Sequence, residues 1–178
     1  TAAAEATAAA EAAANAPQTF ILAATLDNLT GGSDNDIFNG IGGTIDGDIL
    51  NGGDGDDTLK LTFTDADNGS AFQSTDIETF SFRTSAGNAV LVDLGDATGF
   101  TTFTAERLSQ NTTLADVLSV PTTINISRNS AGATDGDVIF AFNGTAVDGT
   151  TDTVDVNLSN NSGATLLNVD GVETVNLV

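Results

Sequence analysis

The nine residues from Gly52 to Lys60, GGDGDDTLK, match every fixed position of the repeat G-G-x-G-x-D-x-U-x, in which U is a large apolar residue. Glycine lets the backbone enter left-handed conformations, so this turn directs carbonyl oxygens and the carboxylate of Asp57 toward one point. The residues after the turn are extended, and strand alternation sends Leu59 inward. The repeat predicts short strands joined by tight, oxygen-rich turns.

Two degenerate copies precede this repeat. Asp48 lies nine residues before Asp57 and is followed by Ile49 and Leu50, but its turn, residues 42–48, is one residue longer than the consensus. In the other copy, residues 31–39, Asp34 occupies the position of the third turn glycine, and we expect it to adopt the left-handed conformation. Three copies within 30 residues predict turns that stack on one another.

The residue types in these turns favour calcium. Ca²⁺ takes six to eight oxygen ligands, so one turn is insufficient and a neighbouring turn must supply the rest. The principal predicted ligands are Asp36, Asp48 and Asp57, in turns opened by Gly31 and Gly52. Two interpretations stay open for the other turn acids, as direct or water-mediated ligands or as acids that initiate turns: Asp34, Asp46, Asp54 and Asp56.

Two further acidic segments resemble calcium loops. Asp135 and Asp137, in the segment DGDVIF, predict another calcium turn. Asp65 and Asp67 have the alternate spacing of an EF-hand loop, but no glutamate closes that loop, so a solvated turn is the preferred interpretation.

Composition restricts the partners. The chain has no Cys, Met, Trp, Tyr or His, which argues against zinc, copper and haem sites. Its formal net charge of −21 opposes binding to nucleic acids and anionic bilayers and favours divalent cations. We expect the chain to be expanded without calcium and to fold when calcium neutralises it.

No catalytic constellation can be assembled. Nucleophilic chemistry would need a serine activated by Lys60, which ends a predicted calcium strand, so we expect no enzyme activity and no catalytic residue. The three arginines, Arg83, Arg107 and Arg128, are expected to form local ion pairs in an acidic field.

The chain divides into three segments. Residues 1–16 are Ala-rich and predict a short helix or linker, residues 17–63 carry the calcium repeats, and residues 64–178 predict a β-solenoid-like domain that continues beyond the fragment, with a β-sandwich as the alternative. Leu108 to Leu118 predicts a short helix. The chain has no run of apolar residues long enough for a transmembrane helix and no signal peptide. The fold class is therefore all-β: a parallel β-roll or β-solenoid with calcium-binding turns after an Ala-rich helix.

One strand type occurs twice in the predicted β-solenoid-like domain. Ile77-Glu78-Thr79 and Val172-Glu173-Thr174 share an apolar-Glu-Thr start followed by alternating apolar residues. Such a recurring start is typical of stacked rungs in a parallel solenoid.

The Gly52 to Lys60 repeat and its copies resemble the RTX repeats of proteins exported by type I secretion. With the Glu-Thr strands, the arrangement is similar to calcium-binding surface-layer proteins of Gram-negative bacteria of the Caulobacter type. The resemblance implies a secreted structural protein at the cell surface that Ca²⁺ folds and assembles into a lattice or filament. A cell-surface glycan or lipopolysaccharide is a candidate partner. The alternatives are a calcium-rigidified adhesin or biofilm matrix domain, and the C-terminal export domain of a secreted enzyme.

Overall fold

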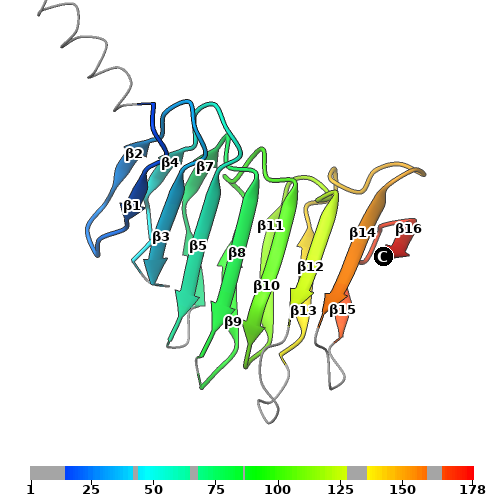
Figure 1. Cartoon of the computed structure of the whole chain (residues 1–178). Helices are drawn as coiled ribbons and strands as arrows, with labels where there is room; N and C mark the ends of the chain where they lie inside the picture. Colours follow the sequence, from blue (N-terminus) through cyan, green and yellow to red (C-terminus); the bar gives the residue numbers. More distant parts are fainter. Residues whose placement is uncertain (1–14, 42–43, 65–67, 86, 128–135, 160–165) are drawn as a thin grey trace, which may run out of the picture.

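The computed structural model describes residues 15–41, 44–64, 68–85, 87–127, 136–159 and 166–178. Within these residues the chain forms strands and loops and no helix, and every strand pairing is parallel. The molecule is a β-solenoid, in which successive coils add strands to the same sheets (Figure 1). The predicted all-β parallel solenoid is confirmed. Residues 1–14 of the predicted Ala-rich helix lie outside the described residues.

One sheet runs the length of the solenoid. Its eight strands are β1 (Thr19–Ile21), β3 (Ile37–Ile41), β5 (Thr58–Phe63), β8 (Thr79–Thr84), β10 (Thr102–Leu108), β12 (Thr123–Ser127), β14 (Thr153–Ser159) and β16 (Thr174–Leu177), in that order. The sheet continues across residues 63 and 64, because β5 pairs with β8 over six residues. The alternative β-sandwich for residues 64–178 is wrong, since the strands of this segment pair in parallel with their equivalents in the next coil.

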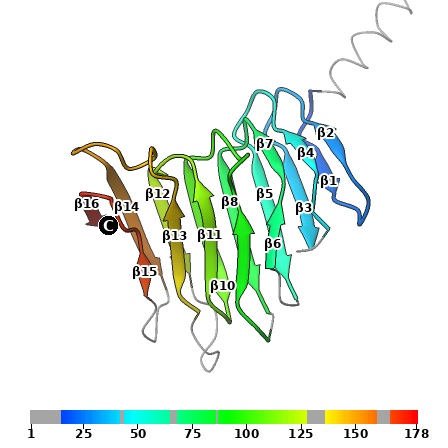
Figure 2. The ribbon, with the colours of Figure 1, turned by 180° about the vertical axis from the view of Figure 1, so that it is seen from behind.

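Two smaller sheets form the opposite side. The three-stranded sheet consists of β2 (Asn28–Thr30), β4 (Ile49–Asn51) and β7 (Gln73–Thr75). The five-stranded sheet consists of β15 (Leu167–Asn168), β13 (Val138–Phe142), β11 (Thr112–Val117), β9 (Val90–Asp93) and β6 (Asn68–Ala71). In Figure 2, the view from behind, the three-stranded sheet lies at the N-terminal end and the five-stranded sheet lies in front of the remaining strands.

The core lies between these layers and is rich in phenylalanine. Strand alternation turns one side chain in two inward, as in β5, where Leu59, Leu61 and Phe63 are buried. Phe103 of the large sheet packs edge-on against Phe140 of the five-stranded sheet, with ring centroids 5.3 Å apart. Burial of each such side chain contributes roughly 1.5–3 kcal/mol, so this core is a large source of stabilisation.

The short helix predicted for Leu108 to Leu118 is wrong. β10 ends at Leu108 and β11 begins at Thr112. Leu114 and Val117 are both buried, and their spacing of three imitates a helical period. The register shifts between them, and Asp116 has a positive φ of 52°. A bulge therefore returns Val117 to the core side of a strand.

Within the described residues no helix is both long and apolar enough to span a bilayer.

Candidate metal centre

The predicted calcium repeats stack in the solenoid, but the repeat of Asp57 lies on the one 21 residues earlier and not on the one nine residues earlier. Asp48 precedes β4 of the three-stranded sheet, whereas Asp57 precedes β5 of the eight-stranded sheet. Copies nine residues apart therefore lie on opposite sides of one coil. The vertical neighbour of Asp57 is Asp36, 21 residues earlier.

The corners that contain residues 31–36 and 52–57 lie directly on each other. The Gly31 N–H donates to the Asn51 carbonyl at 2.8 Å, and the Asp54 N–H donates to the Gly32 carbonyl at 3.1 Å. The Asn35 side chain accepts from the Asp56 N–H at 3.1 Å. These contacts form the acidic corner, by which we mean residues 31–36 together with residues 52–57.

Glycine is required in this corner because the backbones approach so closely. A Cβ added to Gly52 would overlap the Asp76 carbonyl oxygen and Oδ2 of Asp57. Gly53 has a φ of +95°, where L side chains are strained. Asp34, by contrast, is not among the residues with positive φ, so the expected left-handed aspartate is wrong. The backbone of Asp34 instead lies under Gly55, where a Cβ would come within 3.0 Å of it.

Three buried or half-buried acids form a ladder at the start of the eight-stranded sheet. Each accepts a hydrogen bond from a backbone N–H in the preceding coil. Asp36 Oδ1 accepts from Gln18 at 2.7 Å, Asp57 Oδ1 from Asp36 at 2.6 Å, and Glu78 Oε2 from Asp57 at 2.8 Å. The acids therefore satisfy donors that the turn leaves unpaired, a role that needs no metal ion.

A second, shorter ladder lies on the other side of the coil. Asp48 Oδ1 accepts from the Asp27 N–H at 2.9 Å, and Asp27 Oδ2 accepts from the Ala23 N–H at 2.7 Å. Asp46, predicted together with Asp48, is exposed and lies beside it in the same turn.

The three principal predicted ligands differ in their second oxygen. Oδ2 of Asp36 accepts from the Gly32 N–H at 2.6 Å, so both oxygens of Asp36 are used. Asp48 and Asp57 are both 0 % exposed. In each of them Oδ2 is buried and has no hydrogen-bond partner. An unpaired buried carboxylate oxygen is costly, and these two atoms are the ones free to take a ligand.

The environment of these two carboxyls opposes their charge. Burial raises the pKa of Asp57, the N–H of Asp36 lowers it, and the negative charge of Asp36 raises it further. Burial likewise raises the pKa of Asp48; the hydrogen bond from Asp27 lowers it and the charge of Asp27 raises it. A cation at either oxygen would relieve both causes of the upward shift.

The remaining predicted residues divide between exposed and peripheral positions. Asp34, Asp54 and Asp56 are exposed on the acidic corner. Asp137 lies far along the chain, before β13, and its Oδ1 accepts from the Leu166 N–H at 3.0 Å. Asp135, Asp65 and Asp67 lie outside the described residues.

The donor chemistry fits a hard cation, but the carboxylates are not gathered around one point. Among the described residues no three Asp or Glu side chains are grouped so as to hold a metal ion. A cation at the acidic corner would use Oδ2 of Asp57 and would draw in exposed acids from the same corner, namely Asp34, Asp54 and Asp56.

Three acids that accept a backbone N–H in this way were not among the predicted site residues: Asp27 and Glu78 of the two ladders, and Glu173 near the C-terminal end. Glu173 Oε2 accepts from the Asp152 N–H at 2.9 Å, 21 residues earlier, as Glu78 does from Asp57. The shared Glu-Thr strand start was the signal for the two glutamates. Asp27 could have been found by its spacing of 21 from Asp48.

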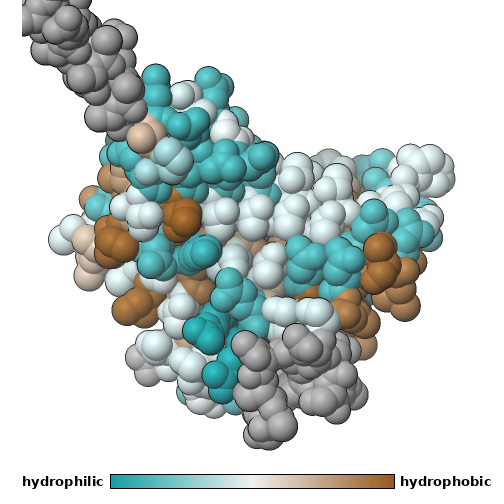
Figure 3. All heavy atoms as spheres, in the orientation of Figure 1, coloured by the Kyte–Doolittle hydropathy of each residue, from teal (hydrophilic) through white to brown (hydrophobic). Residues whose placement is uncertain are grey.

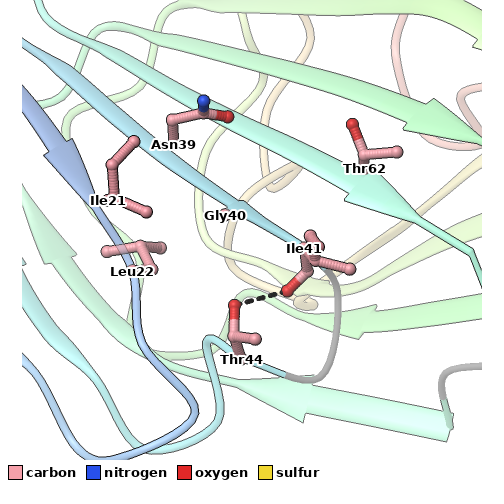
Figure 4. A pocket seen from close by; sticks show the side chains of 7 residues that line it. All are labelled: Ile21, Leu22, Asn39, Gly40, Ile41, Thr44 and Thr62. Atoms are coloured by element: carbon pink, nitrogen blue, oxygen red, sulfur yellow. Dashed lines mark hydrogen bonds between the residues drawn. The ribbon is translucent and has the colours of Figure 1, made fainter.

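A hollow of about 280 Å³ lies at the N-terminal end of the solenoid (Figure 4). It is lined by Ile21, Leu22, Asn39, Gly40, Ile41, Thr44 and Thr62. None of these is a predicted ligand or a charged residue, so the hollow adds nothing to the metal centre.

Comparison of the chain with protein-family models, with curated proteins and with solved structures gives no match.

Proposed function

We propose that this chain is a structural part of an extracellular, calcium-dependent surface layer, exported by type I secretion and folded and assembled by Ca²⁺. The proposal assigns it no catalytic step. The observation that carries it is the unpaired, buried Oδ2 of Asp57 inside a stacked Gly/Asp corner of a parallel solenoid.

Calcium would supply positive charge where the fold concentrates negative charge. Asp36, Asp57 and Glu78 succeed one another along the ladder, and the chain has a net charge of −21. Self-repulsion of this size opposes compaction. Asp57 would hold the ion after exposed acids of the same corner, Asp34, Asp54 and Asp56, are drawn toward it, and the carbonyls of the stacked glycine turns would add neutral oxygen ligands.

The solenoid itself supports a structural role. Parallel coils stacked in one direction form a long, stiff body whose contacts are mostly between neighbouring coils. Calcium-dependent order suits a chain that crosses a secretion channel unfolded and folds on reaching a calcium-rich medium.

The test is a calcium titration of chelator-treated protein, followed by circular dichroism and sedimentation velocity. We expect a gain of β signal together with assembly beyond the monomer. The Asp57→Asn variant should lose most of the calcium response. The matched control, Asp148→Asn, removes one charge from an exposed residue and should respond like the natural chain.

Each other outcome has a definite meaning. A gain of β signal with a strictly monomeric product would contradict the surface layer and favour the adhesin or export-domain alternatives. Unchanged spectra and sedimentation would contradict calcium binding altogether.

A further inference from the structure

The basic residues that the structure describes lie on one face of this acidic chain. Lysine and arginine number only four, and the three that the structure describes are all exposed on the outer side of the eight-stranded sheet. They are Lys60 of β5, Arg83 of β8 and Arg107 of β10, which we call the basic row. In Figure 3, which views this face, strongly hydrophilic side chains gather over the middle strands.

The register of β8 and β10 places two of these charges opposite each other. Ala105 pairs with Phe82, so uninterrupted pairing would set Glu106 against Arg83 and form an ion pair. The register instead shifts at Glu106, and Arg107 pairs with Arg83. Like charges directly opposite each other are destabilising. Bulges of this kind re-aim side chains and are over-represented beside functional sites.

The nearby carboxylate of Glu106 has a different hydrogen-bond partner. Glu106 accepts a hydrogen bond from the Ser81 hydroxyl at 2.7 Å, and neither arginine forms an ion pair with any acid that the structure describes. The local ion pairs expected for Arg83 and Arg107 are therefore not found among those residues, and Arg128 lies outside them. Two exposed guanidinium groups are left to bind an anion from outside the chain.

A row of uncharged polar groups adjoins the basic row on this face, and the carboxylate of Asp155 lies beyond it and accepts from the Asn176 amide at 2.9 Å. The Asn125 amide donates to the Thr104 hydroxyl at 3.3 Å, and the Asn157 amide donates to Asn125 Oδ1 at 2.9 Å. In-register strands repeat about every 4.7–4.9 Å, so these groups form a flat ladder beside the basic row. A ligand matching both features is a polymer with regularly spaced hydroxyls and acidic groups.

We propose that the basic row, with the adjoining Thr/Asn ladder, binds an acidic polysaccharide. Arginine forks bind carboxylates and sulfates with two parallel hydrogen bonds. At physiological salt, charges beyond about 8 Å are largely screened, so the net negative charge of the chain does not prevent local attraction. The inference extends the proposed function by giving the chemistry of a surface ligand, but it does not rest on calcium binding.

The test is affinity electrophoresis of the folded chain, at fixed calcium, through gels containing hyaluronate, dextran sulfate or neutral dextran. We expect retardation by the two acidic polymers that weakens with salt, and none by neutral dextran. Arg83→Gln with Arg107→Gln should weaken binding at least about tenfold, since two charge-assisted contacts are lost. Arg83→Lys with Arg107→Lys keeps the charge and should weaken it less.

A matched control distinguishes the charge of the basic row from the net charge of the chain. Asn28→Asp with Gln73→Glu, on exposed positions of the three-stranded sheet, lowers the net charge by the same two units and should bind like the natural chain. Circular dichroism verifies that each variant is folded. Equal binding by the glutamine variant, equal weakening by the control, or no binding by the natural chain would each overturn the proposal.

Sedimentation distinguishes this inference from the proposed function. If the glutamine variant loses self-association while polysaccharide binding is absent, the basic row contacts a second copy and the polysaccharide proposal is wrong. Calcium-driven assembly with no polysaccharide binding would leave the proposed function intact and overturn only this inference.

Discussion

The N-terminal and middle coils of the solenoid complete the same corner in different ways. At the starts of β3, β5 and β8, an acid accepts from a backbone N–H of the preceding coil. At the start of β12, the Thr122 hydroxyl donates to the Thr101 carbonyl at 3.0 Å. A neutral residue is therefore sufficient to join two coils, so coil stacking alone does not explain the buried charges of the N-terminal corners.

From this difference we expect the N-terminal coils to depend on the charge of their corner acids and the middle coils to be largely independent of it. The largest expected effect tests the part that both share, the core. Phe103→Ala removes a ring that contacts Phe82 and Phe140, and we expect a loss of about 3–5 kcal/mol. Urea denaturation should show the same loss at a lower and at a higher calcium concentration, both of which fold the chain. A loss that depends on calcium would mean that the two regions are not energetically distinct.

The next effect concerns the corner that carries Asp36. Asp36→Ala leaves the N–H groups of Gln18 and Gly32 without their acceptor. We expect a loss of about 1–3 kcal/mol for each donor that stays buried, and less where water reaches it. Asp96→Ala, at an exposed aspartate, is the control and should be nearly neutral. Equal effects would show that the ladder is not stabilising.

The pH dependence without calcium should identify the unpaired carboxyls. Because burial raises the pKa of Asp57 and Asp48 in the folded chain, the folded state binds more protons than the unfolded state. This contribution to stability is fully present below the ordinary pKa of 3.8 and is lost as the pH rises through the raised value. In chelator, the β signal in circular dichroism should therefore be retained in acid and fall as the pH rises over this window.

Asp57→Asn provides the check on that pH dependence. It removes one titrating group, so the fall should be shallower, and the variant should keep more β signal than the natural chain at neutral pH in chelator. A steeper fall, or none in the natural chain, would contradict the assignment of an uncompensated charge at Asp57.

The smallest expected effect belongs to the middle coils. Thr122→Val removes one exposed hydroxyl bond to the Thr101 carbonyl, and we expect a loss of about 0.5–1.5 kcal/mol. The loss should not change with calcium or between pH 4 and 7. If the stability loss caused by Thr122→Val depends on calcium, the middle coils do not differ from the N-terminal coils in the expected way.

Much of the fold followed from local pattern. The Gly/Asp turns and the alternating strands predicted a parallel solenoid, because alternation identifies one buried face and repeated turns identify rungs. The segment Leu108 to Leu118 was misassigned because the bulge at Asp116 changed the period locally. The sandwich alternative stayed open because alternation is the same in parallel and antiparallel sheets.

The residue types of the candidate site could be predicted from the sequence, but the contacts between these residues could not. The sequence by itself determined that the turns would be glycine-rich, acidic and free of soft ligands. Only the tertiary structure decided which turns stack. One coil includes a strand on each side of the solenoid, so its full length sets which turns meet. That length brings Asp57 to Asp36, 21 residues earlier, and not to Asp48. The tertiary structure also decided that Asp36 uses both oxygens while Asp57 keeps one unpaired, and that Arg83 faces Arg107. These outcomes depend on register between strands far apart in the chain, which no local spacing encodes.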